Sequence, residues 1–173
     1  MLLTAGHGRL DRDALSALFV SAGVETVVDI RRYPGSRANP DVARDAMAVW
    51  LPEAGVAYRW EERLGGRRRL PADTPREDPW WQVEQFAAYA AYTRTEPFAA
   101  ALAEVLDESA RRTVVVMCSE SVWWRCHRRL IADVAVLHHG VGVEHLSHSG
   151  RLTPHEPAPG ARLRADGFVV WDG

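Results

Sequence analysis

The segment from Arg111 to Asp133 constrains the fold more than any other part of the chain. Thr113–Met117 is a short β-branched, apolar run of the kind found in fully buried parallel strands. From about Trp124 apolar residues recur at helical spacing, on a stripe formed by His127, Leu130, Ile131, Val134 and Leu137. We therefore predict a strand, a turn and a helix in direct succession. In open α/β sheets, ligands bind at the edge where such strands end.

Reactive side chains gather in this turn and in the predicted helix. Cys118 and Glu120 follow the strand directly, and Cys126 and His127 fall within the predicted helix. The N-terminus of a helix carries a partial positive charge that favours anions and thiolates. We therefore expect Cys118 to be the more reactive thiol and Cys126 the slower one.

The composition is typical of a globular chain with one core. Of 173 residues, 47% are hydrophobic and 25% are charged, and the formal net charge is -2. Because the global field does not attract polyanions, an anion site has to be a local patch. Two cysteines are too few for a disulfide framework, and the sequence shows no signal peptide and no apolar run that could span a bilayer. The expected location is cytoplasmic, without membrane contact.

The rest of the chain alternates strand and helix patterns. Met1–Ala5 and Glu25–Ile30 read as strands around a helix that Asp11 caps and Gly23 ends, a βαβ unit that predicts parallel neighbouring strands. The further predicted elements are helices at Asp41–Ala54, Gln82–Thr93 and Pro97–Ser109, strands at Val56–Trp60 and Val143–Ser147, and an edge strand at Phe168–Trp171. This order predicts a single three-layer α/β/α domain over residues 1–173, with a mainly parallel, Rossmann-like sheet.

Arginines cluster directly after the second predicted strand. Arg31, Arg32 and Arg37 lie in one loop together with Ser36. The guanidinium fork matches phosphate and carboxylate oxygens, so we expect this loop to bind an oxyanion. Gly65, Gly66 and Arg67 begin a second, long polar loop, and loops of that length are usually functional or mobile. At its far end, Trp80 and Trp81 are expected to be core anchors rather than base-stacking surfaces.

Four motifs resemble one known family. They are Thr4–His7, Val28–Ser36, Leu64–Arg68, and Met117–Glu120 leading to Arg125–Arg129. In this order they resemble the domain of unknown function 488 family of bacterial and archaeal proteins. The resemblance implies an α/β fold and little about activity, since the family name describes none. Gly8 and Ser119 depart from the serine and alanine that the family usually has there.

Metal and thiol chemistry are alternatives for the two cysteines. Seven residues separate Cys118 from Cys126, whereas structural zinc sites usually space paired ligands by two to four, and adjacent Cys126 and His127 on a helix would point about 100° apart. Five further histidines (His138, His139, His145, His148 and His155) do not improve that spacing, so we expect no metal and no cofactor. The spacing from Cys118 to Arg125 is one residue longer than the loop of a cysteine phosphatase, which also weakens a sulfur-carrier reading. A redox pair of the two cysteines stays open.

The residues favour an enzyme, a hydrolase or a transferase, acting on a phosphate-bearing ligand such as a nucleotide or nucleic acid. The predicted catalytic residues are His7, Asp29, Cys118, Glu120 and His127, with His7 or His127 carrying a proton near neutral pH. The predicted ligand-binding residues are Arg31, Arg32, Ser36, Arg37, Gly65, Gly66, Arg67, Arg125 and Arg128. The alternatives are a non-catalytic nucleic-acid-binding module and a thiol- or metal-dependent protein that uses Cys118, Cys126 and His127.

Overall fold

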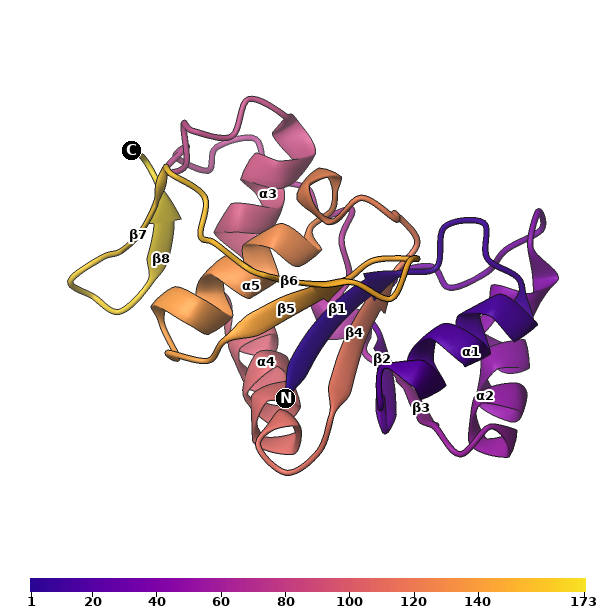
Figure 1. Ribbon diagram of the computed structural model, residues 1–173. Helices are drawn as coiled ribbons and strands as arrows, with labels where there is room; N and C mark the ends of the chain where they lie inside the picture. The colour runs from indigo at the N-terminus through magenta and orange to yellow at the C-terminus, as the bar shows by residue number, and fades with distance from the viewer.

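The computed structural model describes residues 1–173 and has a six-stranded sheet at its centre (Figure 1). The sheet contains β1 (Leu2–Gly6), β2 (Thr26–Asp29), β3 (Ala57–Trp60), β4 (Val114–Cys118), β5 (Val143–Leu146) and β6 (Leu152–Pro154). Their order is β3-β2-β4-β1-β5-β6, and every neighbouring pair is parallel except β5 and β6. The predicted fold class, a mainly parallel α/β sheet, is confirmed.

Helices cover both faces of the sheet. They are α1 (Arg12–Ser21), α2 (Arg44–Glu53), α3 (Glu84–Tyr92), α4 (Glu96–Ser109) and α5 (Arg128–Leu137), with short 3₁₀ turns at Pro40–Val42, Glu62–Leu64 and Trp123–Arg125. In Figure 1, α1 and α2 lie on one side of the strands and α3, α4 and α5 on the other. Asp11 caps α1 by accepting from the backbone N–H of Ala14, and Gly23 follows the helix at φ 66°, as predicted. No helix combines the length and the apolar run that crossing a bilayer requires.

The core is divided by the sheet into two apolar layers, and β4 contributes to both. Val114, Val116 and Cys118 pack into the layer under α3, α4 and α5, while Val115 and Met117 pack into the layer under α1 and α2. This alternation follows from the two-residue period of a strand. It directs the thiol of Cys118 toward α5.

The prediction that the first two strands are neighbours was wrong. β4 lies between β1 and β2 and pairs in parallel with both. Its residues Val114–Met117 are completely buried, so the most apolar strand takes the most protected position in the sheet. The crossover through α1 therefore skips one strand position. As a result, the carboxyl ends of β1, β4 and β2 lie side by side.

The predicted helix start at Trp124 was also wrong. Trp123–Arg125 forms a 3₁₀ turn, Cys126 is extended at φ -128° and ψ 152°, and α5 begins only at Arg128. Two contacts between residues distant in sequence stabilise this interruption between the 3₁₀ turn and α5. The Trp123 ring stacks on His145 at a centroid distance of 3.9 Å, and the Arg128 guanidinium donates to the backbone oxygen of Glu120.

The C-terminal strands form a separate hairpin. The strand predicted at Phe168–Trp171 is present as β8 (Val169–Trp171), which pairs with β7 (Ala161–Leu163) in a two-stranded sheet separate from the main one. Backbone hydrogen bonds join Trp80 to Trp171, and Asp78 accepts from Trp171 N–H and from Arg94. The hairpin therefore packs beside the segment before α3 rather than extending the sheet. β6 and β7, each three residues long, were not predicted.

Candidate functional site

A cavity of about 410 Å³ opens at the carboxyl ends of β1, β2 and β4. Four of the predicted catalytic residues line it, namely His7, Cys118, Glu120 and His127. Six of the predicted ligand-binding residues do so as well: Arg31, Arg32, Ser36, Gly66, Arg67 and Arg125. Asp29, Gly65, Arg37 and Arg128 do not line it. The sheet edge that the sequence pointed to is therefore the place where most of these side chains meet.

Two thiols and an imidazole converge in the wall of this cavity. His127 Nδ1 lies 3.9 Å from Cys118 Sγ and 3.5 Å from Cys126 Sγ. Cys118 sits on the last residue of β4, whereas Cys126 and His127 belong to the break before α5. The three ligand atoms all lie within 4.8 Å of one another, and both cysteines are free thiols. The break thus brings Cys126 and His127 to one side, where a continuous helix would have separated them.

The two thiols differ in acidity in the opposite sense to our expectation. A hydrogen bond with Cys126, followed by burial, raises the pKa of Cys118 to about 12. Burial works against ionisation of Cys126 too, but the hydrogen bond from Cys118 and the charge of Arg128 lower its pKa to about 6. The Arg128 guanidinium, whose Nε lies 3.4 Å from Cys126 Sγ, therefore favours Cys126 over Cys118, the thiol we expected, as the thiolate. The helix N-terminus and its arginine face Cys126, because that residue directly precedes α5.

Arg128 shapes the loop instead of facing the cavity. Its side chain is 1% exposed, its Nε lies 3.4 Å from Cys126 Sγ, and its Nη2 donates to the Glu120 backbone oxygen. Both ends of the β4–α5 turn are therefore tied to one guanidinium. Its role is to position Cys126, and the cavity does not reach it.

Asp29 and Arg31 form a closed ion pair behind the cavity. Arg31 Nε donates to Oδ1 of Asp29 over 2.8 Å and Nη2 donates to Oδ2 over 2.6 Å, while Tyr58 donates to the same carboxylate. Arg31 Nη2 also donates to the backbone oxygen of Val42. Asp29 is fully buried and outside the cavity. Its carboxylate has no free access to a ligand, and most donors of Arg31 are already in use.

His7 is held as a neutral donor and acceptor. Its Nε2 faces Arg31 Nη1 at 3.3 Å, and since a guanidinium only donates, Nε2 accepts. The proton is therefore on Nδ1, which lies 3.0 Å from the Gly8 oxygen. Burial and the charge of Arg31 lower the pKa of His7 to about 4. A neutral imidazole with both nitrogens engaged is poorly placed to transfer a proton near pH 7, the role that the sequence suggested for His7 or His127.

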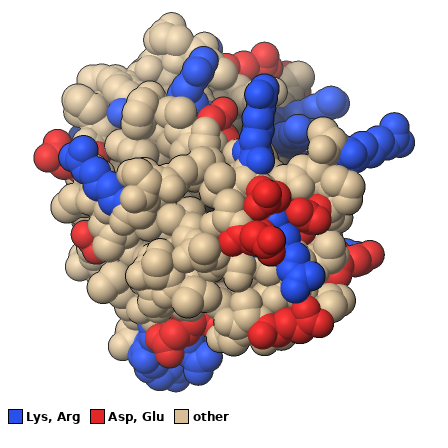
Figure 2. Space-filling model, turned by 45° about the vertical axis from the view of Figure 1, so that its right-hand side comes forward, with Lys and Arg blue, Asp and Glu red and all other residues tan.

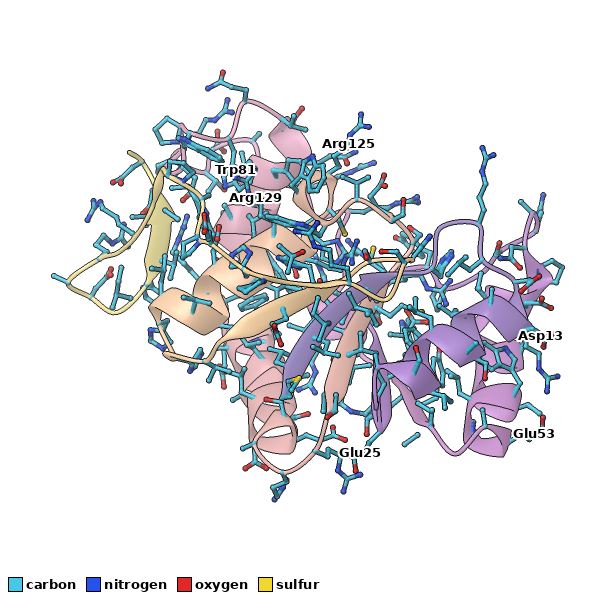
Figure 3. All side chains as sticks on the ribbon, in the orientation of Figure 1. Asp13, Glu25, Glu53, Trp81, Arg125 and Arg129 are labelled. Carbon is cyan, nitrogen blue, oxygen red and sulfur yellow. The ribbon has the colours of Figure 1, made fainter.

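The remaining polar groups of the cavity are mostly cationic. Arg32, Arg67 and Arg125 line it together with a single carboxylate that is not paired with an arginine, that of Glu120. Glu120 Oε1 accepts from the backbone N–H of Val122 over 3.0 Å, which fixes its orientation in the turn. Figure 3 shows Arg125 near α3 at the top of the view, away from the labelled acidic side chains of α1, α2 and the start of β2.

Two buried polar atoms of the cavity residues have no hydrogen-bond partner. They are Nε of Arg32 and Nε2 of His127. Most buried polar groups in proteins are paired, so such atoms call for an explanation. Arg32 uses Nη1 to hold the Arg67 backbone oxygen, and Arg67 is the chain's one non-glycine residue with positive φ, at 57°. Strain of this kind often accompanies a functional loop.

Several cavity residues were not singled out from the sequence. Tyr33 is 63% exposed and lies under the guanidinium groups of Arg32 and Arg67, at 5.6 and 5.9 Å from its ring centre. Gln85, Phe86 and Tyr89 come from α3, whose pattern read as core only. Tyr33 was detectable, because an aromatic residue within an arginine loop suits a ring or base as well as a phosphate. Trp81 is buried, as expected, and neither it nor Trp80 lines the cavity.

The surface around these elements carries charge in small groups. Figure 2 shows arginines and carboxylates interspersed on one face, between wide neutral areas. A second hollow, of about 1400 Å³, adjoins the cavity and shares Arg32, Tyr33, Arg67 and Gln85 with it. Arg68 and Arg69 extend its lining, which contains one carboxylate, that of Glu84. Basic side chains therefore continue from the cavity along the Gly66–Arg69 loop.

Comparison with known proteins identifies the family. The model of the "Domain of unknown function DUF488" family matches residues 12–135, which confirms the resemblance seen in the motifs. No curated protein matches the chain. Among solved structures, a "Putative phosphatase (DUF442)" from Shewanella putrefaciens CN-32 is similar, with a TM-score of 0.40 and 19% identity over 80% of this chain and 67% of that one.

Proposed function

The chain belongs to the DUF488 family, whose name describes no activity, and from the geometry of the cavity we propose that it is an enzyme acting on a phosphate-bearing ligand. The observation that supports this best is the excess of positive charge in the cavity, where Arg32, Arg67 and Arg125 line the wall with a single carboxylate, that of Glu120. A phosphate oxygen accepts from such guanidinium groups and neutralises the excess positive charge. A mononucleotide also fits the presence of Tyr33 at the rim.

The distribution of acid–base groups favours catalysis over simple binding. A binding module needs positive charge spread over a face, whereas here the arginines surround Glu120, His127 and the two thiols within one cavity. Because His7 is neutral and engaged and Asp29 is closed off, Glu120 and His127 are the groups left to transfer a proton. Hydrolysis or transfer at the phosphate-bearing group is the reaction class that this set suits.

A binding assay with matched arginine variants tests the ligand class. Mononucleotides, sugar phosphates and inorganic phosphate should raise the melting temperature of the wild-type protein, because a ligand of the folded state stabilises it. R125A should weaken binding about tenfold or more, since a hydrogen bond between charged groups contributes about 1.5–3 kcal/mol. R37A is the control, because Arg37 is an equally exposed loop arginine that does not line the cavity. Equal losses in both variants would contradict a site at this cavity.

Turnover separates the enzyme from a binder. The ligand that gives the largest thermal shift is tested as a substrate. The rate of product formation should fall strongly in E120Q while binding changes little, because the amide keeps the shape of the carboxylate but cannot accept a proton. Tight binding with no turnover of any tested ligand would indicate that the protein is a binding module and not an enzyme.

A nucleic-acid ligand is the second candidate, and the second hollow favours it. The basic lining continues through Arg67, Arg68 and Arg69 beyond the cavity, farther than one nucleotide requires. A single strand could place one phosphate in the cavity and others along this loop. Its binding should then fall steeply as salt rises, more steeply than that of a mononucleotide. The double variant R68A/R69A should weaken an oligonucleotide and leave a mononucleotide unaffected.

A further inference from the structure

In the cluster of Cys118, Cys126 and His127, two thiols approach a single imidazole. Two sulfur atoms approach the same ring nitrogen, Nδ1 of His127, at 3.9 and 3.5 Å. A ring nitrogen has either one lone pair or one N–H, so it serves only one sulfur well. Both sulfurs belong to buried residues, and each has one further polar neighbour: Arg128 Nε lies 3.4 Å from Cys126 Sγ and Ser119 Oγ lies 3.9 Å from Cys118 Sγ.

The same distances suit three ligands of one metal ion. A tetrahedral zinc ion with bonds of about 2.3 Å to sulfur and about 2.0 Å to nitrogen places a sulfur and a nitrogen ligand about 3.5 Å apart. The separation of 3.5 Å between His127 Nδ1 and Cys126 Sγ matches that value, the separation of 3.9 Å to Cys118 Sγ is somewhat longer, and all three ligand atoms lie within 4.8 Å of one another. Two thiolates and an imidazole form a donor set that favours zinc over magnesium or calcium.

We propose that Cys118, Cys126 and His127 bind a zinc ion in the wall of the cavity. Three protein ligands leave the fourth tetrahedral position open, which is the arrangement of catalytic rather than structural zinc sites. All three residues line the cavity, so the open position is available to water or to an oxygen of a ligand. The site itself does not depend on the proposed function; its role, polarising an oxygen of the phosphate-bearing ligand, rests on that function.

The surroundings of the cluster support ligation by these three side chains. Arg128 Nε points at Cys126 Sγ over 3.4 Å, and N–H groups directed at sulfur orient and stabilise metal-bound thiolates. With zinc on Nδ1, the neutral imidazole carries its proton on Nε2, the atom that has no partner within the protein.

The conformation before α5 differs from the one on which our expectation of no metal depended. That expectation assumed that Cys126 and His127 lie on a regular helix and point apart. The extended conformation of Cys126 turns its side chain toward Cys118, and His127 follows as the N-cap of α5. The long spacing between the cysteines is spanned by the turn from Ser119 to Arg125, so β4 and the start of α5 each supply ligands.

Metal analysis of the purified protein tests the proposal directly. Wild-type protein prepared under reducing conditions without chelator should contain about one zinc ion per chain by mass spectrometry of the metal, as expected for one such site. H127A should lose most of it. H138A should retain it, because His138 lies at the far end of α5.

A cobalt titration keeps the test independent of whether any variant folds. Co²⁺ added to the metal-depleted wild-type protein should give the intense visible bands of a tetrahedral site and a near-ultraviolet band from thiolate ligands. C118S should reduce the thiolate band by about half if one of two sulfur ligands is removed. A protein that purifies without zinc and gives no such bands with Co²⁺, while its circular dichroism shows it folded, overturns the proposal. So does recovery of a Cys118–Cys126 disulfide from cells, because it would assign the pair to redox chemistry.

The two proposals fail separately. Zinc binding without any nucleotide or phosphate binding would support the metal site and contradict the proposed function. Nucleotide binding that R125A weakens, in a protein that binds neither zinc nor cobalt, would support the proposed function and contradict the metal site.

Discussion

His155 donates from Nε2 to Oδ1 of Asp133 over 2.7 Å, and both side chains are completely inaccessible to solvent. This contact ends a chain of hydrogen bonds that begins on the sheet. Thr4 Oγ1 lies 2.6 Å from His145 Nδ1, and His145 Nε2 lies 2.9 Å from His155 Nδ1. With one proton on each ring and the carboxylate of Asp133 accepting, the direction of every bond follows: Asp133 sets the tautomer of His155, and His155 sets that of His145. The network joins β1, β5 and α5.

Asp133 should be among the most stabilising polar residues of the chain. Its carboxylate also accepts from the backbone N–H of Ala158 and from Trp171 Nε1, so it holds the C-terminal hairpin as well. D133N replaces one acceptor oxygen with a donor that faces buried donors. We expect a loss of about 2–4 kcal/mol in the free energy of unfolding, measured with urea, because at least one buried donor loses its partner.

The control for this variant is D172N. Asp172 pairs with Arg162 on the surface, where ion pairs contribute at most about 1 kcal/mol. A D133N protein as stable as D172N would show that the network adds no stability.

Acid should destabilise the protein before its carboxylates titrate. Burial and the charge of Arg31 lower the pKa of His7 to about 4, and burial and His155 lower the pKa of His145 to about 3. Both are below the unfolded value of about 6.5, so the unfolded chain binds protons first and stability falls as pH drops through that value. Each histidine should cost on the order of 1 to 2 kcal/mol between pH 7 and pH 5.

Urea unfolding at a series of pH values measures this loss. The carboxylates with lowered pKa, such as Asp166 and Asp172, contribute only below about pH 4, so the interval from pH 6.5 to 5 reports the histidines together with Cys126, whose pKa is lowered to about 6. Proton NMR of the imidazoles gives a direct check. A His7 ring that titrates near pH 6.5 would refute its engagement with Arg31.

How much of this site was predictable depends on how local its causes are. The end of β4, the cap at Asp11 and the arginine loop follow from short patterns, and the edge of the sheet that carries the cavity followed from them. Arg31 looked like a ligand-binding residue because its loop is basic. Its partner, Asp29, is two residues away, and a buried acid at a strand end next to an arginine could have suggested the ion pair.

The features that were missed depend on contacts distant in sequence. The extended Cys126 requires Trp123 to stack on His145 and Arg128 to reach the Glu120 oxygen, and neither contact has a signal in the apolar stripe. The insertion of β4 between β1 and β2 likewise depends on competition among strands for the centre of the sheet. Helical periodicity was correct for α5 from Arg128 onward and misleading for the residues just before it.

The Asp29–Arg31 pair should be strongly coupled. R31M leaves the Asp29 carboxylate buried without its cation, which should cost about 3–5 kcal/mol in the free energy of unfolding. The double variant D29L/R31M should recover a large part of that loss, since no charge is then buried. A double-mutant cycle by urea denaturation measures the coupling. Additive effects of the two substitutions would mean that the pair is not an energetic unit.

Gly66 should be required for the imidazole of His127 to reach the two sulfurs. A β-carbon at this position would lie 2.9 Å from His127 Nδ1 and 3.2 Å from two further ring atoms. Such contacts are too short, so G66A should displace the ring and lower the zinc content and the cobalt bands to a small fraction of the wild-type values. G35A is the control, because Gly35 lines the same cavity and a β-carbon there meets nothing within 4 Å. Metal analysis and circular dichroism of both variants check this, and a folded G66A protein that keeps its full metal content would show that the ring position is not limited by Gly66.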